Sequence, residues 1–216
     1  MSSARTREKV IVVGASTGGP VAVKELLASL PAECPGIVVT MQMPASFTRT
    51  FAERLNGLCT IKVKQAEDGE PILPGHAYIA PGDRDLQVVR NSGGCRISLA
   101  SLPVKRGFFP SIDVTFRSAA AAVGKNAIGI ILTGMGEDGA AGMLELHQAG
   151  AYTLAQDESS CLFFSMPQHA IALGGISEVV PLAEIPRHLI TYLVAATRPP
   201  SAAGVTYCSS GMAAAV

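Results

Sequence analysis

The sequence predicts a single α/β domain built on a doubly wound, mostly parallel β-sheet with an antiparallel hairpin insert. Short unbroken apolar runs alternate with segments in which apolar residues recur at helical spacing. Strands that are buried on both faces and alternate with helices are typical of a parallel sheet covered by helices. From residue 75 to residue 99, apolar residues instead recur at every second position, with turn sequences between the runs. This change of period predicts the insert.

Each expected element follows from its local pattern. Short, largely apolar runs predict strands at residues 10–13, 36–40, 61–63, 127–132, 151–155 and 179–180. Apolar residues spaced by three or four predict helices at residues 20–30, 46–55, 111–123, 138–149, 166–173 and 182–194. Strands of the insert are expected at residues 76–80, 86–90 and 96–99, separated by turns at residues 81–83 and 91–94. We expect a flexible leader at residues 1–8, the folded domain at residues 9–196 and a disordered tail at residues 197–216.

The composition excludes several classes of protein. Hydrophobic residues make up 48% of the chain and charged residues 16%, which excludes a disordered chain. The 17 Lys and Arg residues balance 17 Asp and Glu residues, so no overall basic charge is available to hold nucleic acid or an anionic membrane. The N-terminal segment has no apolar core of a signal peptide, and no apolar run reaches the ~18 residues that cross a bilayer.

The cysteines indicate a reducing compartment. They number five, are scattered along the chain and form no C-x-x-C pair. They show no metal-ligand spacing with the four histidines, so no metal site is expected. Reduced thiols in a cytoplasmic protein are the simplest interpretation.

In doubly wound sheets, functional residues lie in the loops beyond the carboxyl ends of the strands. The loop after the first strand, residues 14–19, reads GASTGG and fits G-x-S-x-G, a tight turn that exposes a serine hydroxyl, here Ser16, at a helix N-terminus. Free amides at such a helix start can stabilise an oxyanion. The alternative is a phosphate-binding turn with a capping serine, but the loop fits neither G-x-G-x-x-G nor the GK[ST] of a P-loop.

A second loop, residues 132–142, follows the strongest predicted strand and is rich in glycine. Its Asp138 could cap the following helix, but the loop has more glycines than a cap requires, which indicates close backbone contact with a small group. The loop at residues 41–44 is not informative by itself. The chain does not fit an α/β-hydrolase, because in that fold the nucleophile follows several strands, whereas Ser16 follows the first.

Several motifs occur in order over most of the chain. They are GASTGG at 14–19, FAERL at 51–55, AEDGE at 66–70, LPGHAYIAPGD at 73–83, PSIDV at 110–114, LTGMGEDGAAGM at 132–143 and AQDESSC at 155–161. With these motifs, residues 10–193 resemble the catalytic domain of CheB-type chemotaxis protein-glutamate methylesterases. The resemblance implies a doubly wound α/β sheet with a hairpin. It also implies hydrolysis of glutamate γ-methyl esters on chemoreceptor helices, with release of methanol, and in many members deamidation of receptor glutamines.

The resemblance also implies the site. The family uses a Ser–His–Asp triad without metal or organic cofactor, and its motifs place the nucleophile at Ser16, the acid at Asp138 and an oxyanion-hole amide at Met135. The residues expected to support these loops are Thr17, Gly18, Gly134 and Gly136. Many members carry an N-terminal receiver domain whose phosphorylation relieves blockage of the site; we expect a catalytic domain without that control.

The chain departs from the family at the base. The family pattern T-Q-H-M-P corresponds to Thr-Met-Gln-Met-Pro at residues 40–44, which puts Gln42 at the histidine position. A glutamine amide can orient a hydroxyl, but it cannot take its proton near neutral pH. His169 is the one substitute base that the sequence offers. The segment at residues 105–110, usually rich in Arg and His, is also changed, which puts substrate choice in question.

These observations lead to two alternatives. The first is a monomeric, cytoplasmic methylesterase that acts on methyl-accepting chemoreceptor helices through Ser16, without nucleic acid or membrane insertion. The second is a catalytically impaired receptor-binding module, which Gln42 favours.

Overall fold

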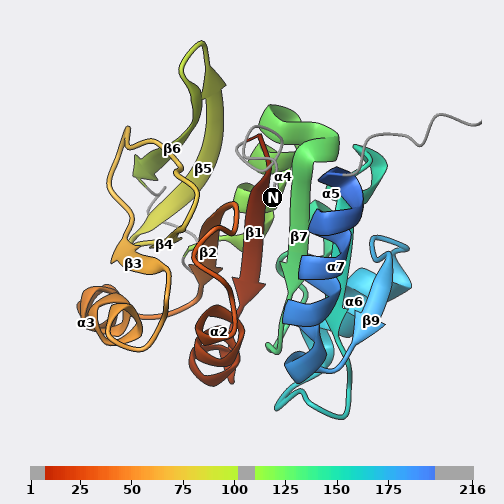
Figure 1. Cartoon of the computed structure of the whole chain (residues 1–216). Coiled ribbons are helices and arrows are strands. Elements are labelled where there is room, and N and C mark those ends of the chain that lie inside the picture. Colours follow the sequence, from red (N-terminus) through yellow and green to blue (C-terminus); the bar gives the residue numbers. More distant parts are fainter. Residues whose placement is uncertain (1–7, 102–109, 198–216) are drawn as a thin grey trace, which may run out of the picture.

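Seven parallel strands form the main sheet of the computed structural model, which describes residues 8–101 and 110–197 (Figure 1). Their spatial order is β3-β4-β2-β1-β7-β8-β9. The strands are β1 (Val10–Ala15), β2 (Gly36–Met41), β3 (Lys62–Gln65), β4 (His76–Ile79), β7 (Ala127–Ile131), β8 (Tyr152–Gln156) and β9 (Glu178–Val180). The order runs outward from β1 in both directions, as expected for a doubly wound sheet.

Helices cover both faces of this sheet. The helices are α2 (Gly19–Ala28), α3 (Ala45–Asn56), α4 (Ile112–Val123), α5 (Ala140–Gln148), α6 (Ser165–Ala172) and α7 (Ile185–Thr197), with short 3-10 turns η1 (Gly124–Asn126) and η2 (Leu182–Glu184). Helices α2, α3 and α7 pack on one face, and α4, α5 and α6 pack on the other (Figure 1). The expected α/β class and doubly wound sheet are therefore confirmed.

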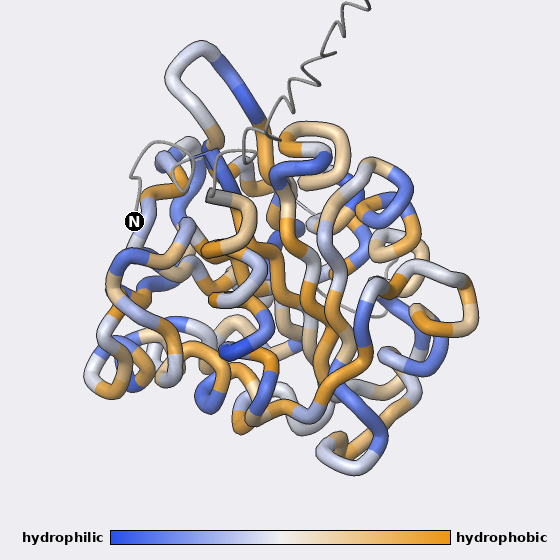
Figure 2. The backbone as a smooth tube through the Cα atoms, turned by 45° about the vertical axis from the view of Figure 1, so that its right-hand side comes forward, coloured by the Kyte–Doolittle hydropathy of each residue, from blue (hydrophilic) through white to orange (hydrophobic). Residues whose placement is uncertain are grey.

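The central strands are apolar because both of their faces are covered. In β1, Ile11 and Val13 belong to the core under α2, α3 and α7, whereas Val10 and Val12 belong to the core under α4, α5 and α6. Figure 2 shows the resulting concentration of hydrophobic segments in the middle of the domain. Unbroken apolar runs thus locate these strands, and they end where the chain leaves the core.

One part of the predicted arrangement is wrong. Residues 76–80 were expected in the antiparallel insert, but β4 lies in the main sheet, parallel to both β2 and β3. The insert has two strands, β5 (Arg84–Asn91) and β6 (Gly94–Ser101), which form a separate antiparallel sheet beside α4. The turn at residues 81–83 leads from one sheet to the other, and a turn sequence alone does not tell which strands pair across it.

The ends of the chain fall largely outside the described residues. Residues 1–7 of the expected leader and residues 198–216 of the expected tail are not described, and neither is most of the altered segment at residues 105–110. Within the described part of the chain, no helix is both long and apolar enough to cross a membrane.

Candidate active site

Ser16 follows β1 directly and lies in a sharp turn that leads into α2. Gly18, the N-cap of α2, has a φ of +85°, a left-handed conformation that favours glycine. A Cβ atom at Gly18 would also lie 2.9 Å from the Cβ atom of Leu162, which leaves no room for a side chain. The Ser16 amide donates to the Thr133 carbonyl oxygen at 3.0 Å. The turn therefore holds a half-buried Ser16 at the carboxyl edge of the sheet.

Gln42 is the first residue after β2 and contacts Ser16. The parallel register places Ala15 opposite Met41, so the residues that follow the two strands become neighbours. Ser16 Oγ donates to Gln42 Oε1 at 3.0 Å, and Gln42 Nε2 donates to Asp138 Oδ2 at 3.0 Å. A carboxylate only accepts hydrogen bonds, so the amide nitrogen faces Asp138 and the amide oxygen faces Ser16. The structure thus brings Ser16, Gln42 and Asp138 together in one hydrogen-bonded chain.

The Asp138 carboxylate lies at the N-terminus of α4. Its Oδ1 atom accepts hydrogen bonds from the Ser111 hydroxyl at 3.2 Å and from the Asp113 amide at 3.0 Å. Its Oδ2 atom accepts a hydrogen bond from the Ile112 amide at 2.9 Å, in addition to the one from Gln42. The amides and the positive end of the helix dipole stabilise a negative charge at this position. The carboxylate is therefore fixed from two sides, by α4 and by Gln42.

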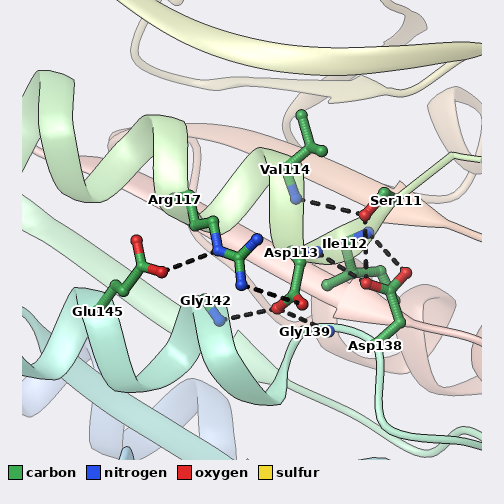
Figure 3. Close-up of polar contacts among 9 residues, drawn as sticks. All are labelled: Ser111, Ile112, Asp113, Val114, Arg117, Asp138, Gly139, Gly142 and Glu145. Atoms are coloured by element: carbon green, nitrogen blue, oxygen red, sulfur yellow. Dashed lines mark hydrogen bonds and ion pairs between the residues drawn. The ribbon is translucent and has the colours of Figure 1, made fainter. Parts of the chain in front are cut away.

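Asp113 makes the reverse contact, from α4 to the start of α5 (Figure 3). Its Oδ1 atom accepts hydrogen bonds from the Gly139 amide at 3.1 Å and the Gly142 amide at 2.7 Å. The expectation that Asp138 caps its own helix is wrong, because α5 begins after Gly139 and Asp113 caps it. Burial raises the pKa of the Asp113 carboxyl; the Gly142 hydrogen bond opposes this rise, and the nearby charge of Asp138 adds to it.

Three backbone amides near Ser16 could hold an oxyanion. Among the residues that the structure describes, no acceptor lies in hydrogen-bonding geometry with the N–H groups of Thr17, Gly18 or Met135. Thr17 and Met135 are exposed, so a substrate can reach both amides. Donors of this kind stabilise the negative oxygen that forms during acyl transfer.

Glycines shape the loop that carries the Met135 amide. A Cβ atom at Gly134 would lie 2.9 Å from Ser16 Cβ and 2.0 Å from Met166 Sδ, so only glycine lets this loop come so close to Ser16. Gly136 has a φ of +88°, in the left-handed region. The four residues expected to support the site, Thr17, Gly18, Gly134 and Gly136, therefore all lie in the two loops beside Ser16.

Sequence-based reasoning missed four residues that support these loops. Ser111 and Asp113 hold Asp138, and Thr133 and Gln156 hold the loops around Ser16. All four occur in the motifs PSIDV, LTGMG and AQDESSC. Their presence in these motifs was the available signal, but no spacing rule distinguished them from their neighbours.

The other candidate bases and nucleophiles do not join the site. His169 is exposed on α6, and its Nδ1 atom lies 2.7 Å from the Ser165 carbonyl oxygen, whereas the Ser16 hydroxyl is bonded to Gln42. Cys161 lies on a loop beside Thr133, but burial raises the pKa of its thiol to about 11, so it stays protonated at neutral pH. Ser16 therefore remains the nucleophile candidate.

A cavity of about 530 Å³ lies beside α3, β3 and the segment that leads into β5. Charged and polar side chains line it, among them Arg49, Glu53 and Arg84, but Ser16, Gln42 and Asp138 do not. The hydrogen-bonded chain at the carboxyl edge, rather than this cavity, carries the groups that can perform chemistry.

Comparisons with known proteins agree with this geometry. The family model described as CheB methylesterase matches residues 11–189. The catalytic domain of the CheB methylesterase of Thermotoga maritima, a crystal structure, superimposes with a TM-score of 0.82 at 37% sequence identity. The match covers 85% of this chain and 98% of that domain.

Curated relatives carry the same name in different bacteria. The protein-glutamate methylesterase/protein-glutamine glutaminase 1 of Geobacter metallireducens is 59% identical over 186 residues, which is 86% of this chain and 51% of that protein. The protein-glutamate methylesterase/protein-glutamine glutaminase of Nitrosomonas europaea is 54% identical over 189 residues, 88% of this chain and 53% of that protein. The chain thus spans about half the length of these relatives.

Proposed function

Because the chain belongs to the CheB methylesterase family, we propose that it hydrolyses glutamate γ-methyl esters on the cytoplasmic helices of chemoreceptors. The names of the curated relatives support methylated glutamate side chains of a protein as the substrate and glutamine side chains as a second one. The single observation that carries the proposal is the chain of hydrogen bonds from Ser16 through residue 42 to Asp138, at the edge of the sheet where such sites lie.

The proposed reaction is an acyl transfer. Ser16 Oγ attacks the ester carbonyl carbon, and the carbonyl oxygen becomes an oxyanion held by the Met135 amide and by the Thr17 and Gly18 amides of the loop after β1. The bond to the methoxy group then breaks, methanol leaves, and a glutamyl ester of Ser16 remains. Water hydrolyses this ester and releases the glutamate carboxylate. The reaction takes place through a side-chain hydroxyl, so we assign it no metal or organic cofactor.

Gln42 limits this reaction in our proposal. Its amide oxygen orients the Ser16 hydroxyl but does not accept the proton, which must pass to water or to the leaving methoxide. In serine hydrolases, loss of the base from a triad costs up to ~10⁶ in turnover. The oxyanion hole and substrate binding alone retain ~10³–10⁴ over the uncatalysed rate. We therefore assign the protein a slow esterase activity. We further propose that it acts in the cytoplasm and as a monomer.

Gln42 also favours a second candidate, a receptor-binding module without turnover. Exposed apolar side chains, Met135, Leu162 and Phe163, lie on the loops beside Ser16 and would contact a receptor helix whether or not an ester is cleaved. Such a module would compete with active methylesterases for the same receptor surface.

Methanol release from methylated receptor membranes tests the proposal. Wild-type protein should release methanol above the spontaneous rate, and Ser16→Ala should release none above it. Ser29→Ala is the matched control, because its hydroxyl is exposed at the end of α2, away from the site, and bonds the Glu25 carbonyl oxygen. If wild type releases no methanol but slows an active methylesterase by binding the same membranes, the binding-module function replaces the esterase function.

A further inference from the structure

Thr133 lies where three loops of the site meet. It follows β7 closely, and only 2% of the residue is exposed. Its Oγ1 atom lies 3.0 Å from the Thr17 carbonyl oxygen, 3.0 Å from the Phe163 amide nitrogen and 3.2 Å from the Phe163 carbonyl oxygen. One buried hydroxyl thus contacts both the loop after β1 and the loop after β8.

The direction of these hydrogen bonds follows from the donors available. The Phe163 amide donates to Thr133 Oγ1, so the hydroxyl proton remains for a carbonyl oxygen. The Phe163 carbonyl oxygen already accepts a hydrogen bond from the Gly134 amide at 2.9 Å. We assign the Thr133 hydroxyl proton to the Thr17 carbonyl oxygen, because that oxygen is the nearer of the two, at 3.0 Å against 3.2 Å, and the described residues offer it no other donor.

The backbone of Thr133 makes two further links. Its carbonyl oxygen accepts the Ser16 amide at 3.0 Å, and its amide donates to Gln156 Oε1 at 2.8 Å. Gln156 is fully buried, and its Nε2 atom donates to the Ser160 carbonyl oxygen at 2.7 Å. Main chain and side chain of Thr133 therefore tie the same loops together.

These links set the direction of the free amides. A peptide unit is planar, so a bond to its carbonyl oxygen also fixes the N–H group on its other side. The Thr133 hydroxyl holds the unit that carries the Gly18 amide, because it bonds the Thr17 carbonyl oxygen. In the same way, the Met166 amide bonds the Gly134 carbonyl oxygen at 3.1 Å and holds the unit that carries the Met135 amide.

We propose that Thr133 is a positioning residue of this site: its hydroxyl aligns the loop after β1 with the loop that carries Met135, so that amides from both converge on one oxyanion. The inference rests on the function proposed above. It matters here because Gln42 leaves the oxyanion hole as the main source of rate enhancement.

Two substitutions at one position separate the hydroxyl from the shape of the side chain. Thr133→Val keeps the shape and loses the hydroxyl, whereas Thr133→Ser keeps the hydroxyl. Removal of one oxyanion donor costs ~10²–10³ in turnover, so we expect its misalignment in Thr133→Val to lower kcat at least ~10-fold. We expect KM to change less than about twofold and Thr133→Ser to keep kcat within about threefold of wild type.

Thr153→Val is the matched control for loss of a buried hydroxyl. Thr153 is fully buried near the amino end of β8, whereas the site lies beyond the carboxyl ends of the strands. Its Oγ1 atom accepts a hydrogen bond from the Ser177 amide at 2.9 Å and lies 3.0 Å from the Ser177 hydroxyl. It should lower the melting temperature much as Thr133→Val does, while leaving kcat unchanged. If both Val variants lower kcat equally, Thr133 acts through stability alone and the proposal is overturned.

A second measurement does not depend on turnover. Amide hydrogen exchange should become faster in Thr133→Val at Ser16 and Gly134, whose amides bond the Thr133 and Phe163 carbonyl oxygens where the loops meet. It should remain as in wild type in Thr133→Ser and Thr153→Val. Absence of methanol release by wild type and by Gln42→His would refute the proposed function, but the exchange comparison would still decide the inference. Unchanged exchange at both residues in Thr133→Val would overturn it.

Discussion

The Oε1 atom of Gln42 lies 3.0 Å from the Oγ atom of Ser16 and accepts its hydrogen bond. The other end of the same amide donates to Asp138, again at 3.0 Å. These are the directions that a neutral histidine would provide in a serine triad, with an acceptor toward the nucleophile and a donor toward the acid. Gln42 thus reproduces the geometry of the triad without its base.

Ser16→Ala should abolish methanol release above the spontaneous rate, because the Ser16 hydroxyl is the group that bonds Gln42 beside the candidate oxyanion amides. The nearby Cys161 thiol stays protonated at neutral pH, since burial raises its pKa to about 11. The measurement is methanol formation with saturating methylated receptor. Full activity in Ser16→Ala would contradict the assignment of the nucleophile.

Asp138→Ala should destabilise the fold through α4 rather than through its own helix. Three donors at the start of α4 lose their acceptor, and loss of a helix cap costs ~0.5–2 kcal/mol. For a domain of this size, each kcal/mol lowers Tm by ~2–4 °C. Thermal unfolding measures the effect, with Glu137→Ala as control, because Glu137 is exposed on the same loop. Equal Tm values for both variants would contradict the cap.

Asp113→Asn should become more stable relative to wild type as the pH rises. Burial raises the pKa of Asp113 above its ordinary value of 3.8, so between the two pKa values the folded protein holds a proton that the unfolded chain has released. The unfolding free energy of wild type therefore falls as the pH rises through this window, and the asparagine variant lacks this term. Denaturant unfolding at several pH values measures it. If the unfolding free energy of wild type instead rises relative to that of Asp113→Asn as the pH rises, the direction of the pKa shift is contradicted.

His169→Ala should leave methanol release unchanged. The His169 ring bonds the Ser165 carbonyl oxygen within α6 and is exposed, whereas the Ser16 hydroxyl is bonded to Gln42. The comparison is of kcat for wild type and variant across neutral pH. Loss of activity in His169→Ala would identify the base on α6 and exclude the proposed role of Gln42.

The sequence predicted the sheet because its strands are buried on both faces. In β1 and β7, every residue is buried, so period and length alone locate the strands and the loops that leave them. The position of β4 was mistaken because a four-residue strand next to a turn has the same pattern in a parallel sheet as in a hairpin. Pairing between strands depends on contacts distant in sequence, which local periodicity does not contain.

The proximity of Gln42 to Ser16 could be predicted because adjacent parallel strands end at one edge. The roles of Asp113 and Thr133 could not, because both act through backbone groups of loops distant in sequence. Only the fold shows that the carboxylate in α4 caps α5, and that one hydroxyl joins three loops.

The most direct test of the account is methanol release by Gln42→His. An imidazole at residue 42 could accept the Ser16 proton and then pair with Asp138, and general-base action is worth ~10²–10⁴-fold. Gln42→Asn, which retains an amide, is the control and should not gain activity. We predict a rise of at least ~10²-fold for Gln42→His, with an apparent pKa of about 6.5, abolished again by Ser16→Ala. A rate for Gln42→His that equals wild type, in a variant that remains folded, would contradict the claim that Gln42 limits this site.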